Sequence, residues 1–134
     1  MAIVIVDDSV TCLVVLKHLS AAANHGPVQT YSDPRAALAF LADNDAELLI
    51  VDCLMPHIDG ITLVSALRGN PRHERTPVVM VTQVTDEEVR KRALAAGVTS
   101  FLSKPVSLNQ YKYAVQAALG RERAAPAAPA APAG

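Results

Sequence analysis

The chain has 134 residues, of which 51% are hydrophobic, and its 12 basic residues nearly balance its 13 acidic ones. This length and composition suit one compact domain with a full hydrophobic core. A formal net charge of -1 offers no basic stripe, which argues against direct binding of nucleic acid or of an anionic membrane surface. No apolar run approaches the ~20 residues of a membrane span. Cys12 and Cys53 are the only cysteines, which favours reduced thiols over a disulfide framework. A cytoplasmic protein is therefore expected.

Short apolar runs that alternate with helical patterns predict five strands, each followed by a helix. Four of the five runs lack polar alternation, which is typical of strands covered on both faces. The strands are expected at residues 2–6, 28–32, 47–51, 77–82 and 98–103. Helix starts are predicted from capping residues, which are, in chain order, Ser9, Asp33, Asp59, Thr85 and Ser107.

A repeat of strand and helix predicts the α/β class, with a doubly wound parallel sheet and right-handed crossovers. The domain is expected to span residues 1–120. Residues 121–134, RERAAPAAPAAPAG, are rich in proline and alanine, so a disordered tail or linker is expected there. The four histidines share no metal-binding spacing, and surface or loop positions are expected for His18, His25, His57 and His73.

Polar side chains stand at the carboxyl ends of four of the five predicted strands. Asp7 and Asp8 follow the first strand, Asp52 follows the third, Thr82 ends the fourth, and Lys104 follows the fifth. Any one of them alone is as consistent with a turn or a helix cap. Because the carboxyl ends of parallel strands meet at one edge of a sheet, all five are expected to converge there.

The charges of these residues predict a divalent metal site. Three carboxylates and one ammonium leave an excess of about two negative charges, which Mg2+ with its preference for oxygen ligands neutralises. A carboxylate held beside Mg2+ can attack phosphorus and form an aspartyl phosphate. The hydroxyl of Thr82 and the cation of Lys104 would then meet the phosphoryl oxygens.

Four motifs carry a resemblance to a known family: IVDDS, LLIVDCLMPHIDG, PVVMVT and FLSKP. In their order and spacing they resemble the receiver domain of bacterial two-component response regulators, from Ile3 to about Leu119. The resemblance implies a flavodoxin-like (βα)5 fold with strand order 2-1-3-4-5. It also implies that Asp52 accepts a phosphoryl group from a histidine kinase or a histidine phosphotransfer protein.

The same resemblance implies the ligands of the metal. Asp8 and Asp52 would bind Mg2+ directly, and Asp7 would bind it through water. The backbone carbonyl of Leu54 would complete the ligands that the protein supplies. By itself the domain would be no enzyme, because it would catalyse only its own phosphorylation and dephosphorylation.

A conformational switch is implied as well. Thr82 and Phe101 match the family's switch pair, Lys104 matches its phosphate-binding lysine, and the peptide bond from Lys104 to Pro105 would be cis. Taken alone, Phe101 fits a plain core position better, because an apolar ring in the last strand more often packs in the core. Phosphorylation would change the surface of the fourth helix, fifth strand and fifth helix, which a downstream protein would read; the domain would be a monomer or a phosphorylation-dependent dimer.

Three positions depart from the family pattern. Gln83 follows the switch threonine where a small residue is usual, and it is expected to crowd phosphodonors. Leu54 and Val84, two residues beyond Asp52 and Thr82, are apolar. Since hydrolysis needs a water in line with phosphorus, we expect a comparatively long-lived phosphoryl group.

Two further classes stay open beside the phosphorylation switch. A degenerate receiver would keep the fold as an interaction module and never accept phosphate, and Gln83 leaves room for it. A phosphohydrolase of the haloacid dehalogenase kind requires Asp-x-Asp, whereas this chain reads Asp7-Asp8-Ser9. A dinucleotide-binding enzyme is disfavoured because no Gly-x-Gly-x-x-Gly follows the first strand. The chain is expected to be either a stand-alone receiver or part of a longer regulator.

Overall fold

The computed structural model describes residues 2–83 and 86–123, with only the backbone described at 121–123. The expectations for Val84, Thr85 and the proline-rich segment from 124 on lie outside the described residues. The strands are β1 (Ile3–Val6), β2 (Val28–Tyr31), β3 (Leu48–Val51), β4 (Val78–Thr82) and β5 (Ser100–Ser103). The helices are α1 (Val10–Ala22), α2 (Pro34–Asp43), α3 (Gly60–Arg68), α4 (Glu87–Ala96) and α5 (Leu108–Arg123), with a short 3-10 turn η1 (Pro71–His73).

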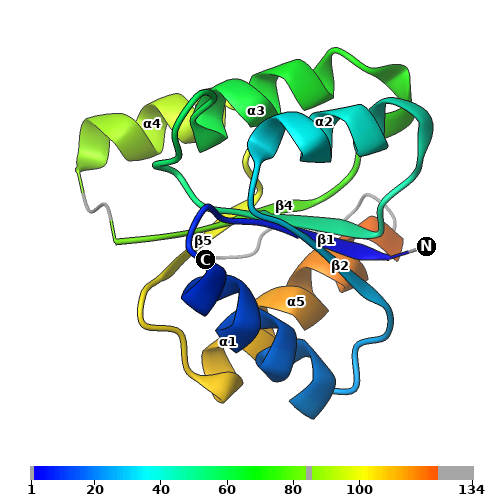
Figure 1. Ribbon diagram of the computed structural model, residues 1–134, viewed down its shortest axis with the longest axis vertical. Coiled ribbons are helices and arrows are strands. Elements are labelled where there is room, and N and C mark those ends of the chain that lie inside the picture. The colour runs from blue at the N-terminus through cyan, green and yellow to red at the C-terminus, as the bar shows by residue number, and fades with distance from the viewer. Residues whose placement is uncertain (1, 84–85, 124–134) are drawn as a thin grey trace.

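All strand pairs are parallel, and the sheet has the order β2-β1-β3-β4-β5. Helices α1 and α5 cover one face of the sheet, and α2, α3 and α4 cover the other, as Figure 1 shows. The chain winds outward in both directions from β1, so the winding reverses between β1 and β3. The predicted flavodoxin-like fold and its strand order are therefore confirmed.

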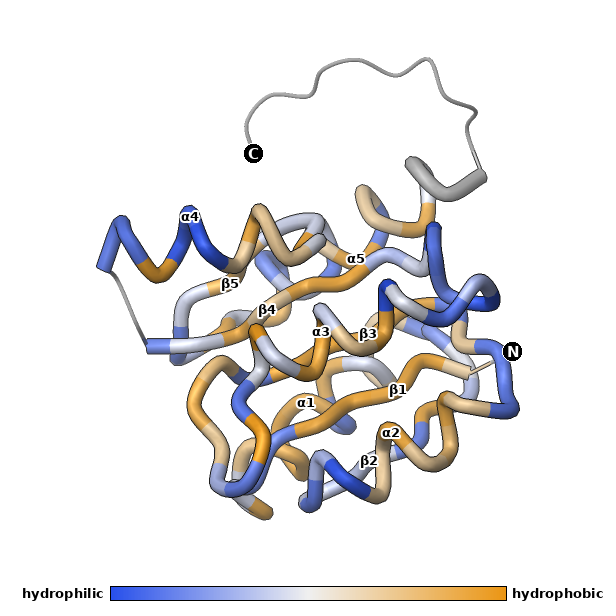
Figure 2. The backbone as a smooth tube through the Cα atoms, turned by 90° about the horizontal axis from the view of Figure 1, so that it is seen from above, coloured by the Kyte–Doolittle hydropathy of each residue, from blue (hydrophilic) through white to orange (hydrophobic). Residues whose placement is uncertain are grey.

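The sheet separates two hydrophobic cores, which explains the unbroken apolar runs. Side chains alternate between the faces of a strand. In β1, Val4 and Val6 pack in the core beneath α2, α3 and α4, while Ile3 and Ile5 pack in the core beneath α1 and α5. Every residue of the central strands β1, β3 and β4 is buried. In Figure 2 these strands lie in the middle of the molecule and are coloured mainly as hydrophobic.

Capping residues start the helices where the sequence predicts them, with one exception. The side chains of Ser9, Asp33 and Asp59 each accept a hydrogen bond from a backbone N–H of the first helical turn. At α4 the N-cap is Asp86, one residue after the predicted one, and its side chain accepts a hydrogen bond from the N–H of Glu88. A carboxylate one residue further along meets the exposed amides at that helix start.

One histidine prediction is wrong, because His73 is fully buried. Its ring lies between α2 and the segment before β4, with Nδ1 3.0 Å from Thr76 Oγ1 and Nε2 2.8 Å from the carbonyl oxygen of Leu41. Both ring nitrogens are paired, which removes the usual cost of burying a polar side chain. His73 is therefore a structural residue of the core.

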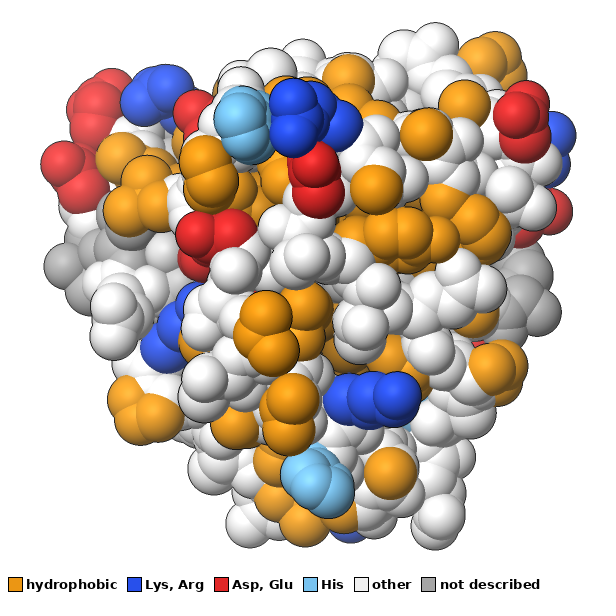
Figure 3. Space-filling view, in the orientation of Figure 1, with side chains coloured by type: hydrophobic (Ala, Val, Ile, Leu, Met, Phe, Trp, Pro, Cys, Tyr) orange, Lys and Arg blue, Asp and Glu red, His pale blue; other side chains and the backbone are white. Residues whose placement is uncertain are grey.

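No helix among residues 2–83 and 86–123 is both long and apolar enough to cross a membrane. On the face drawn in Figure 3, lysine and arginine side chains stand apart from one another, among acidic and apolar ones. That face therefore carries no continuous basic field of the kind that nucleic acids require.

Candidate functional site

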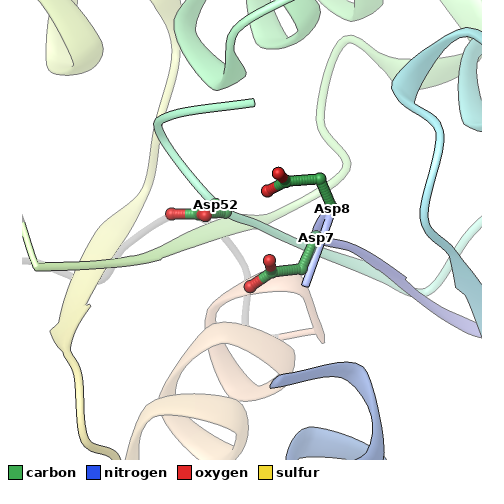
Figure 4. Close-up of side chains that lie close together, drawn as sticks. All are labelled: Asp7, Asp8 and Asp52. Carbon is green, nitrogen blue, oxygen red and sulfur yellow. The ribbon is translucent and has the colours of Figure 1, made fainter. Parts of the chain in front are cut away.

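Three acidic side chains meet where β1 and β3 end side by side. Val6 pairs with Val51 in register, and the N–H of Asp52 donates to the carbonyl oxygen of Val6 over 3.0 Å. The next residues, Asp7 and Asp52, therefore leave the sheet together. Carboxylate oxygens of Asp7, Asp8 and Asp52 all lie within 4.8 Å of one another, and Figure 4 shows the three side chains facing a common space.

The acidic pocket, defined by Asp7, Asp8 and Asp52, has a closed floor and an open side. Asp7 is 1% exposed and Asp52 is 9% exposed, whereas Asp8 is exposed. Burial raises the pKa of Asp52 above its ordinary value, and the charge of Asp7 adds to this shift. The cation of Lys104 and the N–H of Cys53 oppose it. The pocket thus holds concentrated negative charge that solvent reaches from one side.

Lys104 closes the pocket from the end of β5. Its Nζ lies 2.9 Å from Asp7 Oδ2 and 3.4 Å from Asp52 Oδ2. Burial opposes the charged form of Lys104, but the hydrogen bond with Asp7 and the charges of Asp52 and Asp7 outweigh it and raise its pKa. The side chain of Lys104 is therefore positively charged at physiological pH. As the resemblance implies, the peptide bond from Lys104 to Pro105 is cis.

Backbone amides hold the other oxygen of each buried carboxylate. The N–H of Ser9 donates to Asp7 Oδ1 over 2.9 Å, and the N–H of Cys53 donates to Asp52 Oδ1 over 2.8 Å. In both aspartates the Oδ2 atom is left facing Lys104. The carboxylates are thus oriented before any ligand arrives.

Thr82 and Phe101 lie on the neighbouring strands β4 and β5. Thr82 ends β4 and is 6% exposed, and it pairs in register with Ser103. Phe101 pairs with Met80, and its half-buried ring packs on the core beneath α2, α3 and α4. Because side chains alternate along β4, Thr82 projects toward the same face as Met80 and therefore as Phe101.

Leu54 and Gln83 stand at the rim of the pocket, as their places in the sequence suggest. The Leu54 side chain is 65% exposed, just after β3. Gln83 is exposed and lines an apolar pocket of about 280 Å3 together with Lys104 and with Cys12 and Val15 of α1. Gln83 thus lines a pocket beside α1, and its expected crowding of phosphodonors stays a prediction.

Two residues near the site were missed by sequence reasoning. Gly60 follows the Met-Pro-x-x-Asp turn, and a Cβ atom there would collide with the backbone carbonyl of Asp52 and lie 3.0 Å from the Cα of Cys53. Its signal was the Asp-Gly pair, which we interpreted only as a helix start. Arg90, whose guanidinium carbon lies 4.6 Å from the centroid of the Phe101 ring, had no signal beyond its place in a run of basic residues.

The residues present fit a magnesium ion. Their donors are hard carboxylate oxygens, two of them buried and oriented by amides, and the exposed side leaves room for the waters that Mg2+ retains. Burial and the charge of Asp7 raise the pKa of Asp52, and a divalent cation would relieve the repulsion between these two carboxylates.

Comparisons with known proteins agree with this fold. The model of the response regulator receiver domain matches residues 3–116. The chain is 38% identical over 105 residues to the cyclic di-GMP phosphodiesterase response regulator RpfG of Xanthomonas campestris, covering 78% of this chain but only 28% of RpfG. The chain thus spans less than a third of that relative.

Two solved structures extend the comparison. The chemotaxis protein CheY4 of Vibrio cholerae has a TM-score of 0.83 and 30% identity, with 88% of this chain and 98% of that one covered. The receiver domain of the sensor histidine kinase PA1611 of Pseudomonas aeruginosa has a TM-score of 0.81 over 89% and 97% of the two chains. That structure carries a magnesium ion in its active site cleft, but at 21% identity it shows the fold alone.

The doubly wound sheet with acids at its switch point agrees with the match to receiver domains, a class that implies phosphorylation-based signalling. The chain belongs to the response regulator receiver domain family. Domains of this family interact with histidine kinases and with output partners. The predicted resemblance of the four motifs to this family is thereby confirmed.

Proposed function

We propose that this domain is a phosphorylation switch in which Asp52 accepts a phosphoryl group from a histidine kinase or a histidine phosphotransfer protein. The observation that carries the proposal is the convergence of Asp7, Asp8 and Asp52 with the cation of Lys104. Burying an isolated carboxylate would cost folding free energy. This set of three acids and one cation instead suits the binding of a metal ion together with a dianionic group.

Asp7, Asp8 and Asp52 are the residues that would hold Mg2+, with the carbonyl of Leu54 as a further ligand. When bound, the ion supplies positive charge that stabilises the oxygens of the transferring phosphoryl group. Asp8 is the exposed member, so it lies nearest to solvent, from which the ion and its waters arrive.

The chain's own residues then account for the transfer. An oxygen of the Asp52 carboxylate attacks phosphorus; the new O–P bond forms as the P–N bond of the donor phosphohistidine breaks, and the imidazole leaves with its electron pair. The Cys53 N–H orients the carboxylate through Oδ1. Lys104 neutralises charge on the phosphoryl oxygens, to which its ammonium can turn from Asp7.

The output of the switch follows from Thr82 and Phe101. A phosphoryl oxygen would accept a hydrogen bond from the Thr82 hydroxyl, which moves that side chain toward Asp52. The Phe101 ring on the neighbouring strand would then turn inward and change the surface formed by α4, β5 and α5. A downstream protein or an output domain that prefers one of the two surfaces shifts their populations.

The proposed function also includes a cellular location and an oligomeric state. We place it in the cytoplasm, as a monomer or a phosphorylation-dependent dimer, and with no chemistry beyond its own phosphorylation and dephosphorylation. The net charge of -1 agrees with protein partners rather than direct contact with nucleic acid.

Intact mass spectrometry after incubation with acetyl phosphate and Mg2+ tests the acceptor. The wild-type chain should gain one phosphoryl mass, Asp52→Asn should gain none, and a chelator should abolish the gain. Asp43→Asn, which removes an exposed carboxylate at the end of α2, is the matched control and should behave as wild type. Absence of any gain in the wild type would favour the phosphate-independent interaction module instead.

A further inference from the structure

The outer face of Phe101 is covered by a cation from α4. The guanidinium carbon of Arg90 lies 4.6 Å from the ring centroid, within the range of a cation–π contact. The inner side of the ring packs on the core beneath α4. Phe101 is thus held between the core on one side and Arg90 on the other.

Among the described residues, Arg90 forms no ion pair with the acidic side chains near it. Glu87 lies three residues before it on α4, a spacing that favours ion pairs. Yet among the residues that the structure describes, no ion pair involves Arg90, and the carboxylate of Asp86 is engaged as the N-cap. The aromatic ring is therefore the contact that orients this guanidinium.

The contact between Arg90 and Phe101 involves one residue of the proposed switch pair. Thr82 and Phe101 lie on paired strands and face the same side of the sheet. Only three residues separate Thr82 from Asp86, the cap of α4, and Arg90 follows one turn later. A displacement of Thr82 therefore bears on the Phe101 ring across the paired strands, and Arg90 holds the same ring from α4.

We propose that Arg90 is a positioning residue that latches Phe101 in its half-buried position, so that the ring must leave the guanidinium when it turns inward. This inference rests on the proposed function, because it assigns the regulation of that switch. A half-exposed cation–π contact changes the ratio of the two ring positions by about two- to five-fold. Removing it should therefore favour the inward ring and speed phosphorylation of Asp52 by about the same factor.

The composition makes the ring directly observable. The chain has two phenylalanines, Phe40 and Phe101, so incorporation of 4-fluorophenylalanine yields two fluorine NMR signals. A Phe40→Leu variant assigns them, and the Phe40 signal, from a ring 5.8 Å from that of Tyr31, serves as an internal reference. Intact mass measures the rate of phosphoryl gain from acetyl phosphate in the same samples.

Three variants separate the ring contact from net charge. Arg90→Met removes the cation and keeps much of the chain length, and it should shift the Phe101 signal toward its phosphorylated position and raise the phosphorylation rate about two- to five-fold. Arg90→Lys should restore part of the wild-type behaviour. Lys91→Met removes a neighbouring exposed cation and should change neither readout.

Unchanged Phe101 signal and rate in Arg90→Met would overturn the latch, and so would an equal effect of Lys91→Met, which would trace the change to net charge. If the wild type gains no phosphoryl group, the proposed function fails instead. In that case the unphosphorylated fluorine spectra of Arg90→Met and Arg90→Lys still decide whether the guanidinium positions the ring.

Discussion

The ammonium of Lys104 lies closer to Asp7 than to Asp52, with Nζ 2.9 Å from Asp7 Oδ2 and 3.4 Å from Asp52 Oδ2. The lysine is thus anchored by the more deeply buried neighbour of the proposed acceptor. Lys104 therefore offsets the charge of Asp7 at closer range than that of Asp52, whose pKa is raised by burial and, to a smaller extent, by the charge of Asp7.

Replacing Lys104 should destabilise the metal-free fold. Lys104→Met leaves the 1% exposed side chain of Asp7 without its cation. Because the lysine itself is 17% exposed, solvent screening keeps the loss of unfolding free energy at about 1–3 kcal/mol, below that of a fully buried pair. Urea unfolding with a chelator present measures it. Lys112→Met, at an exposed site on α5, should change stability by less than about 0.5 kcal/mol; an equal loss there would contradict the argument.

Removing the charge of Asp52 should stabilise the metal-free protein in a pH-dependent manner. The pKa of Asp52 is raised above 3.8 in the folded chain, so the folded state binds protons more readily than the unfolded one. Wild-type stability relative to Asp52→Asn should therefore fall as the pH climbs from 3.8 through the folded-state pKa. Melting temperatures between pH 3.5 and about pH 7 measure this, with Asp43→Asn as the control. A difference that grows toward acidic pH would refute the sign.

Magnesium should raise the melting temperature in a saturable way that depends on Asp8. Asp8→Asn should weaken the apparent affinity about ten-fold or more, because a ligand on the open side of the pocket is lost. Without the ion, the same variant should differ from wild type by less than about 0.5 kcal/mol, since Asp8 is exposed. Titration of the melting temperature with MgCl2 measures both effects, and an unaltered Mg2+ response in Asp8→Asn would exclude this residue as a ligand.

Gly60 should not tolerate a methyl group. In Gly60→Ala the new Cβ would collide with the carbonyl of Asp52, so the turn after β3 must shift at a cost of about 1–3 kcal/mol. The shift moves the acceptor, and the rate of phosphoryl gain should fall as well. Gly26→Ala, where a Cβ meets nothing within 4 Å, is the matched control. Comparable stability of the two variants would show that the turn is more pliable than its contacts imply.

A polar residue at position 54 should shorten the life of the phosphoryl group. Leu54 is 65% exposed beside Asp52 and cannot hydrogen-bond a water, whereas Asn can hold one in line with phosphorus. Loss of phosphoryl mass with time should be several-fold faster in Leu54→Asn. Val10→Asn, an equally exposed apolar site at 66%, should keep the wild-type half-life. Identical decay in both variants would remove the idea that Leu54 limits hydrolysis.

Local patterns in the sequence were sufficient for the α/β class and for the members of the acidic pocket. Parallel strands that are buried on both faces appear in the sequence as continuous apolar runs. Because the carboxyl ends of such strands lie at one edge of the sheet, Asp7, Asp8 and Asp52 were predicted to meet there. The start of α4 at Asp86 differed from the prediction because two adjacent residues offered capping oxygens.

The sequence by itself thus determined the α/β class, the sheet order through its family resemblance, and which acids converge. Only the tertiary structure decided that Lys104 leans toward Asp7, that His73 is buried, and that Arg90 covers Phe101. The physical reason is that strand and helix patterns are set by neighbours a few residues apart. These contacts instead join segments up to 97 residues apart in the chain, and their geometry exists only once the helices are packed on the sheet.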